Sequence, residues 1–222
     1  MHTAKQKVIK MQIEKTMENL RKNNMDAYYV EKSEDVKQKV AELIKEGDTV
    51  AVGGSETLVQ TGVMDMLRSG KYRFLDRYAP GLDAEGIRRI FIESFSADVY
   101  LSSSNAVTMK GELYNVDGNS NRIAAICYGP KSVIMVAGCN KIVPDIKAAG
   151  LYVKKVSAPS NAVRLGSDTY CASAGVCQGI ADDSITAGCN CNGRICCNYL
   201  VSACQRVPGR IKVILVGEEL GF

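Results

Sequence analysis

Most of the cysteines lie close together near the end of the sequence, where their thiols could bind a metal. The chain has nine cysteines, and seven of them fall between Cys171 and Cys204, spaced C-x5-C, C-x-C-x4-C-C and C-x6-C. Thiolates are soft ligands that suit zinc or an iron–sulfur cluster. These spacings match neither the bacterial ferredoxin pattern nor a pair of C-x2-C zinc knuckles, so they do not identify the metal. The segment predicts a metal site, with reduced free thiols and a redox disulfide as alternatives.

Glycines and polar residues follow several of the expected strands, where they could bind an anion. The first group is Gly53, Gly54, Ser55 and Thr57, in a glycine turn between a strand and a helix. Glycines allow close approach of the backbone, and the free amide groups at the start of a helix attract negative charge. The plainer alternative is a tight turn with Ser55 as the helix cap.

A second group of polar side chains is expected to face the same cleft. Ligands of parallel α/β sheets bind beyond the carboxyl ends of the strands, so segments that follow strands converge there. The Arg122 guanidinium suits a phosphate or a carboxylate. We predict a site for a small anionic metabolite, and we expect Arg122→Ala to weaken binding without unfolding the protein. The group comprises Ser103, Asn105, Asp117, Asn119 and Arg122, and residues 76–78 follow a further strand.

Acid–base chemistry in this chain would have to proceed without histidine. The sole histidine is His2, so Ser-His-Asp, Cys-His and HExxH sites are excluded. Glu112 and Asp117 are weak candidates for a catalytic carboxylate, although a hairpin would explain both without chemistry. The sequence has no nucleotide-cofactor motif, and it leaves the catalytic residues unassigned.

Alternating strand and helix patterns must position these residues. Such alternation is typical of parallel βαβ units. We predict an α/β fold, a single domain over residues 1–222 with a mainly parallel central sheet flanked by helices. The cysteine-rich segment, residues 168–205, would form a C-terminal lobe of this domain. Strands are expected at residues 27–30, 49–52, 72–75, 99–103, 133–136, 152–156 and 210–216.

Three local patterns make narrower predictions. Asp117-Gly118 predicts a hairpin. Gly150 is expected to end a helix over residues 144–149. Asn140 and Lys141 follow a strand, in the position where ligands bind, but a solvated loop is the simpler interpretation.

Composition and charge narrow the classes of function. The 222 residues include 28 basic and 24 acidic side chains, a net charge of +4, which is too balanced for a nucleic-acid-binding face. No run approaches the roughly 18 apolar residues of a membrane span, and the charged N-terminus lacks the apolar centre of a signal peptide. We expect a cytoplasmic protein with no nucleic-acid or membrane partner, compatible with a homo-oligomer.

Four segments together resemble the LUD domain family, the proteins similar to lactate utilization protein C. The resemblance covers nearly the whole chain and implies a fold of the CoA-transferase and ribose-phosphate-isomerase type. It also implies metal ligands, because Cys171, Cys177, Cys191 and Cys196, with Cys189 next, follow the family's cysteine pattern. The stretch between Cys177 and Cys189 is longer here than in that pattern. The four segments are ADVYLSSSNAVTMKGELYNVDGNSNRIAA (97–125), GPKSVIMVAGCNKIV (129–143), GGSETLVQTG (53–62) and PGRIKVILVGEELGF (208–222).

The resemblance implies a function in organic-acid metabolism. A protein of this kind would assist the oxidation of lactate or a related organic acid, acting with iron–sulfur oxidoreductase subunits. One alternative is a stand-alone isomerase- or CoA-transferase-like enzyme acting on a phosphorylated or CoA-linked small molecule. Another is a binding protein without turnover that a metal stabilises. Whether the chain is an enzyme is left open at this point.

Overall fold

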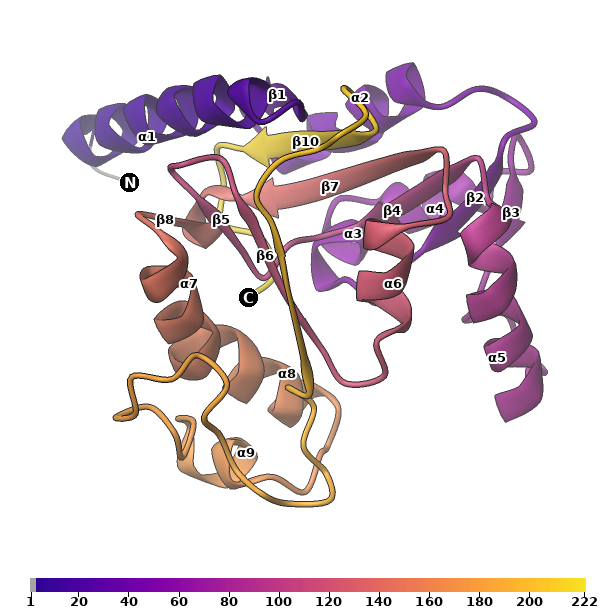
Figure 1. The fold of residues 1–222 in the computed structure, drawn as a ribbon. Coiled ribbons are helices and arrows are strands. Elements are labelled where there is room, and N and C mark those ends of the chain that lie inside the picture. Colours follow the sequence, from indigo (N-terminus) through magenta and orange to yellow (C-terminus); the bar gives the residue numbers. More distant parts are fainter. Residues whose placement is uncertain (1–2) are drawn as a thin grey trace.

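A six-stranded parallel sheet forms the centre of the protein (Figure 1). The computed structural model describes residues 3–222, and His2 lies outside the described residues. Neighbouring strands in this sheet all run parallel, which confirms the predicted α/β fold. The strand order is β1 (Asp26–Val30), β10 (Ile211–Val216), β7 (Ser132–Gly138), β4 (Val99–Ser102), β2 (Thr49–Val52) and β3 (Arg73–Leu75).

Helices cover both faces of this sheet, because side chains along each strand alternate between two apolar surfaces. Ala51 and Tyr100 pack on one face, and their neighbours Val50 and Leu101 pack on the other. Removing both surfaces from water is the main stabilising contribution to such a core. The first face is covered by α1 (Thr3–Lys22) and α6 (Asn121–Cys127), and the second by α2 (Val36–Leu43), α3 (Glu56–Gln60) and α4 (Val63–Leu67). A further helix, α5 (Ala84–Glu93), connects β3 to β4.

A second sheet, of four strands, is a feature that the sequence patterns did not indicate. Its order is β8-β5-β6-β9, with β5 parallel to β8 and β6 antiparallel to both of its neighbours. The strand β9 belongs to the cysteine-rich segment, so its pairing with β6 ties this segment into the domain. The bounds are β8 (Ile142–Val143), β5 (Ala106–Thr108), β6 (Leu113–Asp117) and β9 (Asn198–Ser202).

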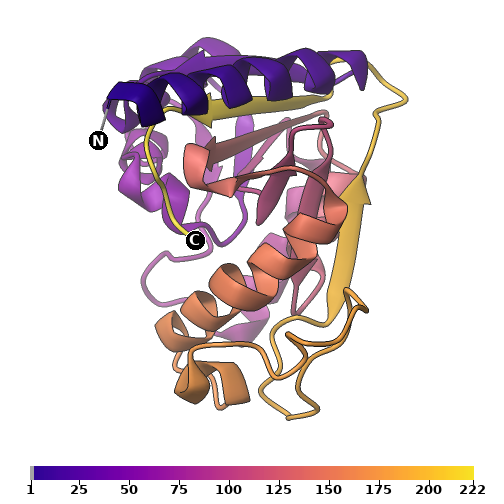
Figure 2. The same ribbon diagram turned by 90° about the vertical axis from the view of Figure 1, so that its left-hand side faces the viewer.

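A continuous helical run connects the small sheet to the cysteine-rich segment (Figure 2). The strand expected at residues 152–156 is wrong, because Ala149, Val153 and Ala158 pack from one helical face onto the small sheet. Gly150 does not end a helix either. It lies inside the run, where an added Cβ would be 3.1 Å from Ile185 Cγ2, so glycine lets the cysteine-rich segment approach closely. The run comprises α7 (Ile146–Tyr152), a π-helical stretch (Val153–Ser157) and α8 (Ala158–Arg164).

Asp117-Gly118 leads into a helix, and the hairpin predicted there is wrong. The Asp117 carboxylate accepts hydrogen bonds from the amides of Arg122 (3.0 Å) and Ile123 (3.3 Å), which satisfies free donors at the start of α6. The hairpin of this region lies instead between β5 and β6, where Gly111 has a φ of +81°. Hydrogen bonds from the helix amides to the Asp117 carboxylate therefore favour the start of a helix here over the hairpin that Asp-Gly predicts.

Lys154 holds the loop that follows the short helix α9 (Tyr170–Ala174). Its side chain is buried, and Nζ donates to the carbonyl oxygens of Gly179 (2.8 Å), Asp182 (3.2 Å) and Ser184 (2.6 Å). Three acceptors match the three hydrogens of an ammonium group. Part of the order in the cysteine-rich segment thus comes from a lysine of the helical run.

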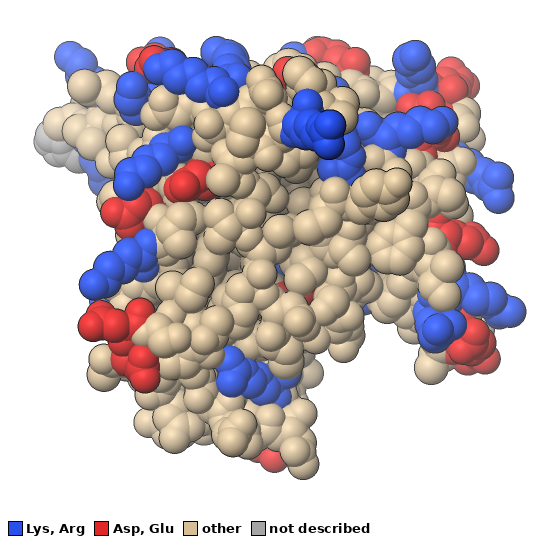
Figure 3. Space-filling view, in the orientation of Figure 1, with Lys and Arg blue, Asp and Glu red and all other residues tan. Residues whose placement is uncertain are grey.

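Charged side chains lie mainly around the edge of the face seen in Figure 3, whose centre is largely uncharged. Basic and acidic residues are mixed along that edge. Within residues 3–222, none of the helices combines the length and the apolar character needed to cross a membrane.

Candidate functional site

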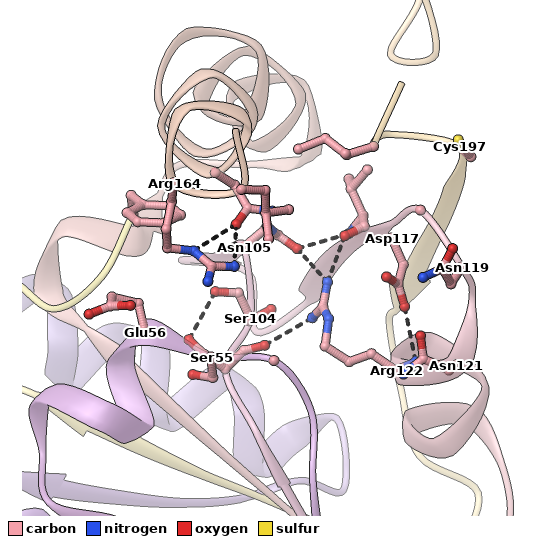
Figure 4. Close-up of a pocket in the computed structure, with 18 of the residues that line it drawn as sticks. Ser55, Glu56, Ser104, Asn105, Asp117, Asn119, Asn121, Arg122, Arg164 and Cys197 are labelled. Carbon is pink, nitrogen blue, oxygen red and sulfur yellow. Dashed lines mark hydrogen bonds between the residues drawn. The ribbon is translucent and has the colours of Figure 1, made fainter. Parts of the chain in front are cut away.

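A cavity of about 530 Å³ lies beyond the carboxyl ends of β2, β3 and β4. Its walls also include residues from the end of β6, from α8, from the cysteine-rich segment and from the last turn of the chain (Figure 4). This is the edge at which parallel α/β sheets bind ligands. The volume falls in the range of roughly 300–1,000 Å³ typical of small-molecule sites.

Seven of the nine predicted ligand residues line this cavity. The other two lie behind its wall: Gly53 packs against Arg122, and Thr57 accepts a hydrogen bond from Lys141. Arg77 and Tyr78, which follow β3, line the cavity as well. The fold therefore brings the two predicted groups together, while ligand binding by them stays a prediction. The seven are Gly54, Ser55, Ser103, Asn105, Asp117, Asn119 and Arg122.

The glycine turn at the start of α3 has a local structural role. Ser55 Oγ accepts a hydrogen bond from the amide of Leu58 (3.2 Å), as a helix cap does. An added Cβ at Gly53 would lie 2.8 Å from Ser102 Oγ and 3.0 Å from Arg122 Cγ. Glycine is needed at position 53 because the Arg122 side chain crosses directly over its backbone.

Arg122 is a buried part of the cavity wall. Burial lowers the pKa of its guanidinium, and the Asp117 carboxylate acts in the opposite direction. The acceptors of its guanidinium are uncharged oxygens, so Arg122 contributes positive potential to the cavity. Its hydrogen bonds brace the wall and leave few N–H groups free to bind a ligand. Its two terminal nitrogens donate to Ser103 O (3.1 Å), Asn115 Oδ1 (2.8 Å), Asn105 Oδ1 (2.9 Å) and Val116 O (2.6 Å).

Lys141 is also buried in this wall, so the interpretation of its segment as a solvated loop is wrong. The residue is 3% exposed, and Nζ donates to Ser103 Oγ (2.9 Å) and Thr57 Oγ1 (3.1 Å). Burial, together with the nearby Arg122 charge, lowers the pKa of Lys141 to about 7. The signal that could have identified it is its position in the short turn that follows β7 (Cys139–Lys141), at the edge where ligands bind.

The cavity carries an excess of positive charge. Five basic side chains line it, against the two acidic side chains of Glu56 and Asp117. Figure 4 shows the Arg164 guanidinium, from α8, across the cavity from Arg122. Arg164 comes from the end of α8 and Arg194 from the cysteine-rich segment, so neither follows a strand whose end could have indicated it. The five are Arg77, Arg122, Lys141, Arg164 and Arg194.

The two candidate catalytic carboxylates have structural partners. Glu112 lies in the β5–β6 hairpin, outside the residues that line the cavity, and accepts a hydrogen bond from Thr108 Oγ1 (2.8 Å). Asp117 lines the cavity, but its carboxylate accepts hydrogen bonds from the amides at the start of α6. These contacts explain both carboxylates without chemistry, and their catalytic roles are untested.

The cysteine-rich segment gathers thiols without a ready set of metal ligands. Sγ of Cys189 and Sγ of Cys191 are 3.2 Å apart, and Cys171 and Cys177 of the same segment are buried. Across the described residues 3–222, no three or more cysteine, histidine, aspartate or glutamate side chains are arranged to hold a metal. This arrangement does not fit a four-thiolate site without movement of the loop. A metal on Cys171, Cys177, Cys191 and Cys196, with Cys189 next, stays a prediction.

The family of the chain follows from a domain match. The LUD domain model matches residues 13–216. The chain belongs to the LUD domain family. This match confirms the family that the sequence segments resemble, and it includes the glycine turn, the Arg122 wall and the cysteine-rich segment of this LUD protein. The comparison with curated proteins found no match.

Solved structures similar to this LUD protein share little sequence identity with it. A DUF162 family protein from Deinococcus radiodurans is 17% identical, with a TM-score of 0.49, over 95% of this chain and 98% of that chain. Translation initiation factor eIF-2B of Pyrococcus horikoshii OT3 is 17% identical, with a TM-score of 0.37, over 52% and 49% of the two chains. For eIF2B beta of Chaetomium thermophilum, the identity is 19%, the TM-score is 0.35 and the coverages are 51% and 43%.

Proposed function

We propose that this LUD protein binds lactate or a related small organic acid in its cavity and assists the oxidation of that acid, together with iron–sulfur partner proteins of the cytoplasm. The observation that carries the proposal is the basic lining of the cavity, where four arginines and Lys141 face two acidic side chains around a space lined by hydroxyl and amide groups, so that the arginines alone outnumber the carboxylates. Positive charge in a partly enclosed site stabilises a carboxylate more strongly than it would in water. Hydroxyl and amide groups are suitable partners for the 2-hydroxyl group of such an acid.

Two arginines are best placed to hold the carboxylate. Arg164 shares one acceptor, Asn161 Oδ1, between Nε (3.1 Å) and Nη2 (2.7 Å), so other N–H groups of its guanidinium are available. Arg77 stacks over the rings of Tyr78 and Phe91, with its guanidinium carbon 5.1 Å and 4.6 Å from their centroids. Stacking leaves the edge of a guanidinium free, and that edge forms paired hydrogen bonds with a carboxylate.

Oxidation of an acid bound in the cavity needs an electron acceptor. Oxidation of a 2-hydroxy acid to a 2-oxo acid releases two electrons and two protons, which another group must accept. The resemblance of this chain to lactate utilization proteins implies iron–sulfur partner subunits, and it supports these subunits as that acceptor. A carboxylate site in the LUD protein would then present the acid to the partner or retain the product.

A second candidate function is supported by the size of the cavity. At about 530 Å³ it exceeds what a three-carbon acid requires, and the same basic residues would suit a phosphate group. An isomerase- or CoA-transferase-like enzyme acting on a phosphorylated or CoA-linked compound is therefore the alternative.

Calorimetric titration of the wild-type protein distinguishes these functions. Lactate, glycolate and pyruvate would be compared with ribose 5-phosphate and CoA under the same conditions. We expect saturable binding of at least one organic acid, with affinity that falls as salt is added, because the attraction is electrostatic. Binding of ribose 5-phosphate or CoA, with none of the organic acids, would replace this proposal with the alternative.

A further inference from the structure

Lys141 occupies an unusual environment for a lysine. Its side chain is buried in the wall of the cavity, and its hydrogen-bond acceptors are the hydroxyl oxygens of Ser103 (2.9 Å) and Thr57 (3.1 Å). Throughout the part of the chain that the structure describes, no carboxylate forms an ion pair with Nζ. A buried ammonium without a carboxylate is costly, so burial favours the neutral amine.

The hydrogens of the two hydroxyl groups are already used. Thr57 Oγ1 donates to Ser103 Oγ (3.4 Å), and Ser103 Oγ donates to the carbonyl oxygen of Ser104 (3.3 Å). Both oxygens therefore accept hydrogens from Lys141. A neutral amine has two hydrogens to donate, which these acceptors satisfy, and its lone pair remains free. Lys154 contrasts with this, since its Nζ donates to three carbonyl oxygens.

The surrounding charges act in the same direction. Arg122 lies in the same wall and repels a second positive charge, so burial and this repulsion together lower the pKa of Lys141 to about 7. The last residues of the chain cover the amine: an added Cβ at Gly221 would lie 2.7 Å from Thr57 Oγ1 and 3.3 Å from Lys141 Nζ. The Gly221 amide is held by Gln60 Oε1 (2.8 Å). At neutral pH a substantial fraction of Lys141 is then an uncharged amine beside the cavity.

We propose that Lys141 is a nucleophile that condenses with the carbonyl carbon of a small 2-oxo acid held in the cavity. This inference rests on the proposed function, because the arginines would hold the carboxylate of the same acid. The lone pair of Nζ forms the new C–N bond, giving a carbinolamine. The carbonyl oxygen and both amine hydrogens then leave as water, and a C=N double bond remains. The condensation is not a redox step, so it needs no oxidant or reductant.

Reductive trapping tests this inference. The full-length protein would be incubated at neutral pH with pyruvate and sodium cyanoborohydride, which reduces an imine to a stable secondary amine. Intact mass would count the adducts, and peptide mapping would locate them. We expect one adduct per chain on Lys141, none on the buried Lys154, and loss of the adduct in Lys141→Arg. A wild-type protein without an adduct at Lys141, or with adducts spread over exposed lysines only, would overturn the inference.

The same samples separate this inference from the proposed function. Lactate has no carbonyl carbon to condense with an amine, so calorimetric titration with lactate reports the carboxylate site alone. Lactate binding without trapping of pyruvate at Lys141 would refute the nucleophile and leave the proposed function standing. Absence of both lactate binding and pyruvate trapping would refute both. Thermal unfolding of Lys141→Arg would show whether that variant is folded, and the wild-type trapping result decides the inference without it.

Discussion

Asn105 and Arg122 are joined side chain to side chain, with Arg122 Nη2 donating to Asn105 Oδ1 over 2.9 Å. The same oxygen accepts a hydrogen bond from the backbone amide of Val116, also at 2.9 Å. The side chain of Asn105, in the turn after β4, is therefore linked both to α6 and to β6. The main sheet and the small sheet meet at this point. The stability of the cavity wall therefore depends on one buried guanidinium.

Replacing Arg122 with Ala should destabilise the protein, contrary to the expectation from the sequence alone. The substitution removes four hydrogen bonds, leaves the buried Asn115 Oδ1 without this donor and opens a cavity. Because each unsatisfied buried group costs about 1–3 kcal/mol, we expect the free energy of unfolding to fall by about 3 kcal/mol or more. Urea denaturation measures this change, with the exposed Arg88→Ala as the control, expected within about 0.5 kcal/mol of wild type. An Arg122→Ala protein as stable as wild type would show that the guanidinium does not brace the wall.

Replacing Lys141 with Met should stabilise the protein, most strongly at low pH. The folded pKa of Lys141, about 7, lies below the ordinary value of 10.5, so the unfolded chain binds more protons between these values. The stability of wild type accordingly rises with pH across this window, and the cost of burying the amine is fully present below pH 7. Since each unit of pKa difference corresponds to about 1.4 kcal/mol, the cost of burying the amine amounts to several kcal/mol. The gain in stability of the variant is smaller than this cost, because the hydroxyl groups of Ser103 and Thr57 each lose a donor.

Urea denaturation at about pH 6 and about pH 9.5 measures this linkage. The stability difference between Lys141→Met and wild type should be larger at the lower pH. The exposed Lys155→Met controls for loss of a lysine at the surface. An advantage of Lys141→Met that is the same at both pH values, or is larger at high pH, would show that the amine is not held neutral by burial.

The cysteine-rich segment should contain a metal when the protein is purified without oxygen. We expect bound iron or zinc that is lost in Cys196→Ser and retained in Cys127→Ser, whose thiol lies at the end of α6. Loss of the metal should increase hydrogen exchange across residues 171–204 while β2 stays protected, because metal binding to such a loop is local folding energy. Elemental analysis and hydrogen exchange by mass spectrometry check both points. A metal-free wild-type protein with a protected segment would mean that packing and Lys154 suffice to order it.

The main sheet could be predicted because most of its strands, such as β4, β7 and β10, are buried apolar runs separated by helical patterns. The small sheet could not, since β8 and β5 have two and three residues and β6 pairs with a strand far along the chain, as Asn115 does with Leu200. Tyr152, Val153 and Val156 are residue types that are common in strands, but packing of Val153 against the small sheet accompanies a helical run here.

The site was predictable to the extent that it is built from strand ends. Ser103 and Asn105 follow β4 directly, so their place in the cavity follows from the parallel topology. The burial of Lys141 depends on the last turn of the chain folding over it, and Arg164 reaches the cavity from the end of α8, far along the chain from the strands whose ends form the cavity. Such long-range packing leaves no signal in local patterns.

The measurement that bears most directly on the proposed function is calorimetric titration of lactate into wild type, Arg164→Gln and Arg88→Gln. Arg164 lines the cavity and Arg88 lies on the exposed surface of α5, so the two substitutions remove equal charge at different places. If a carboxylate binds in the cavity, Arg164→Gln should weaken lactate binding by about tenfold or more, as expected for loss of a charge-assisted contact, and Arg88→Gln should leave it close to wild type. Equal affinities in all three proteins, or no saturable binding to wild type, would contradict the assignment of this cavity to an organic acid.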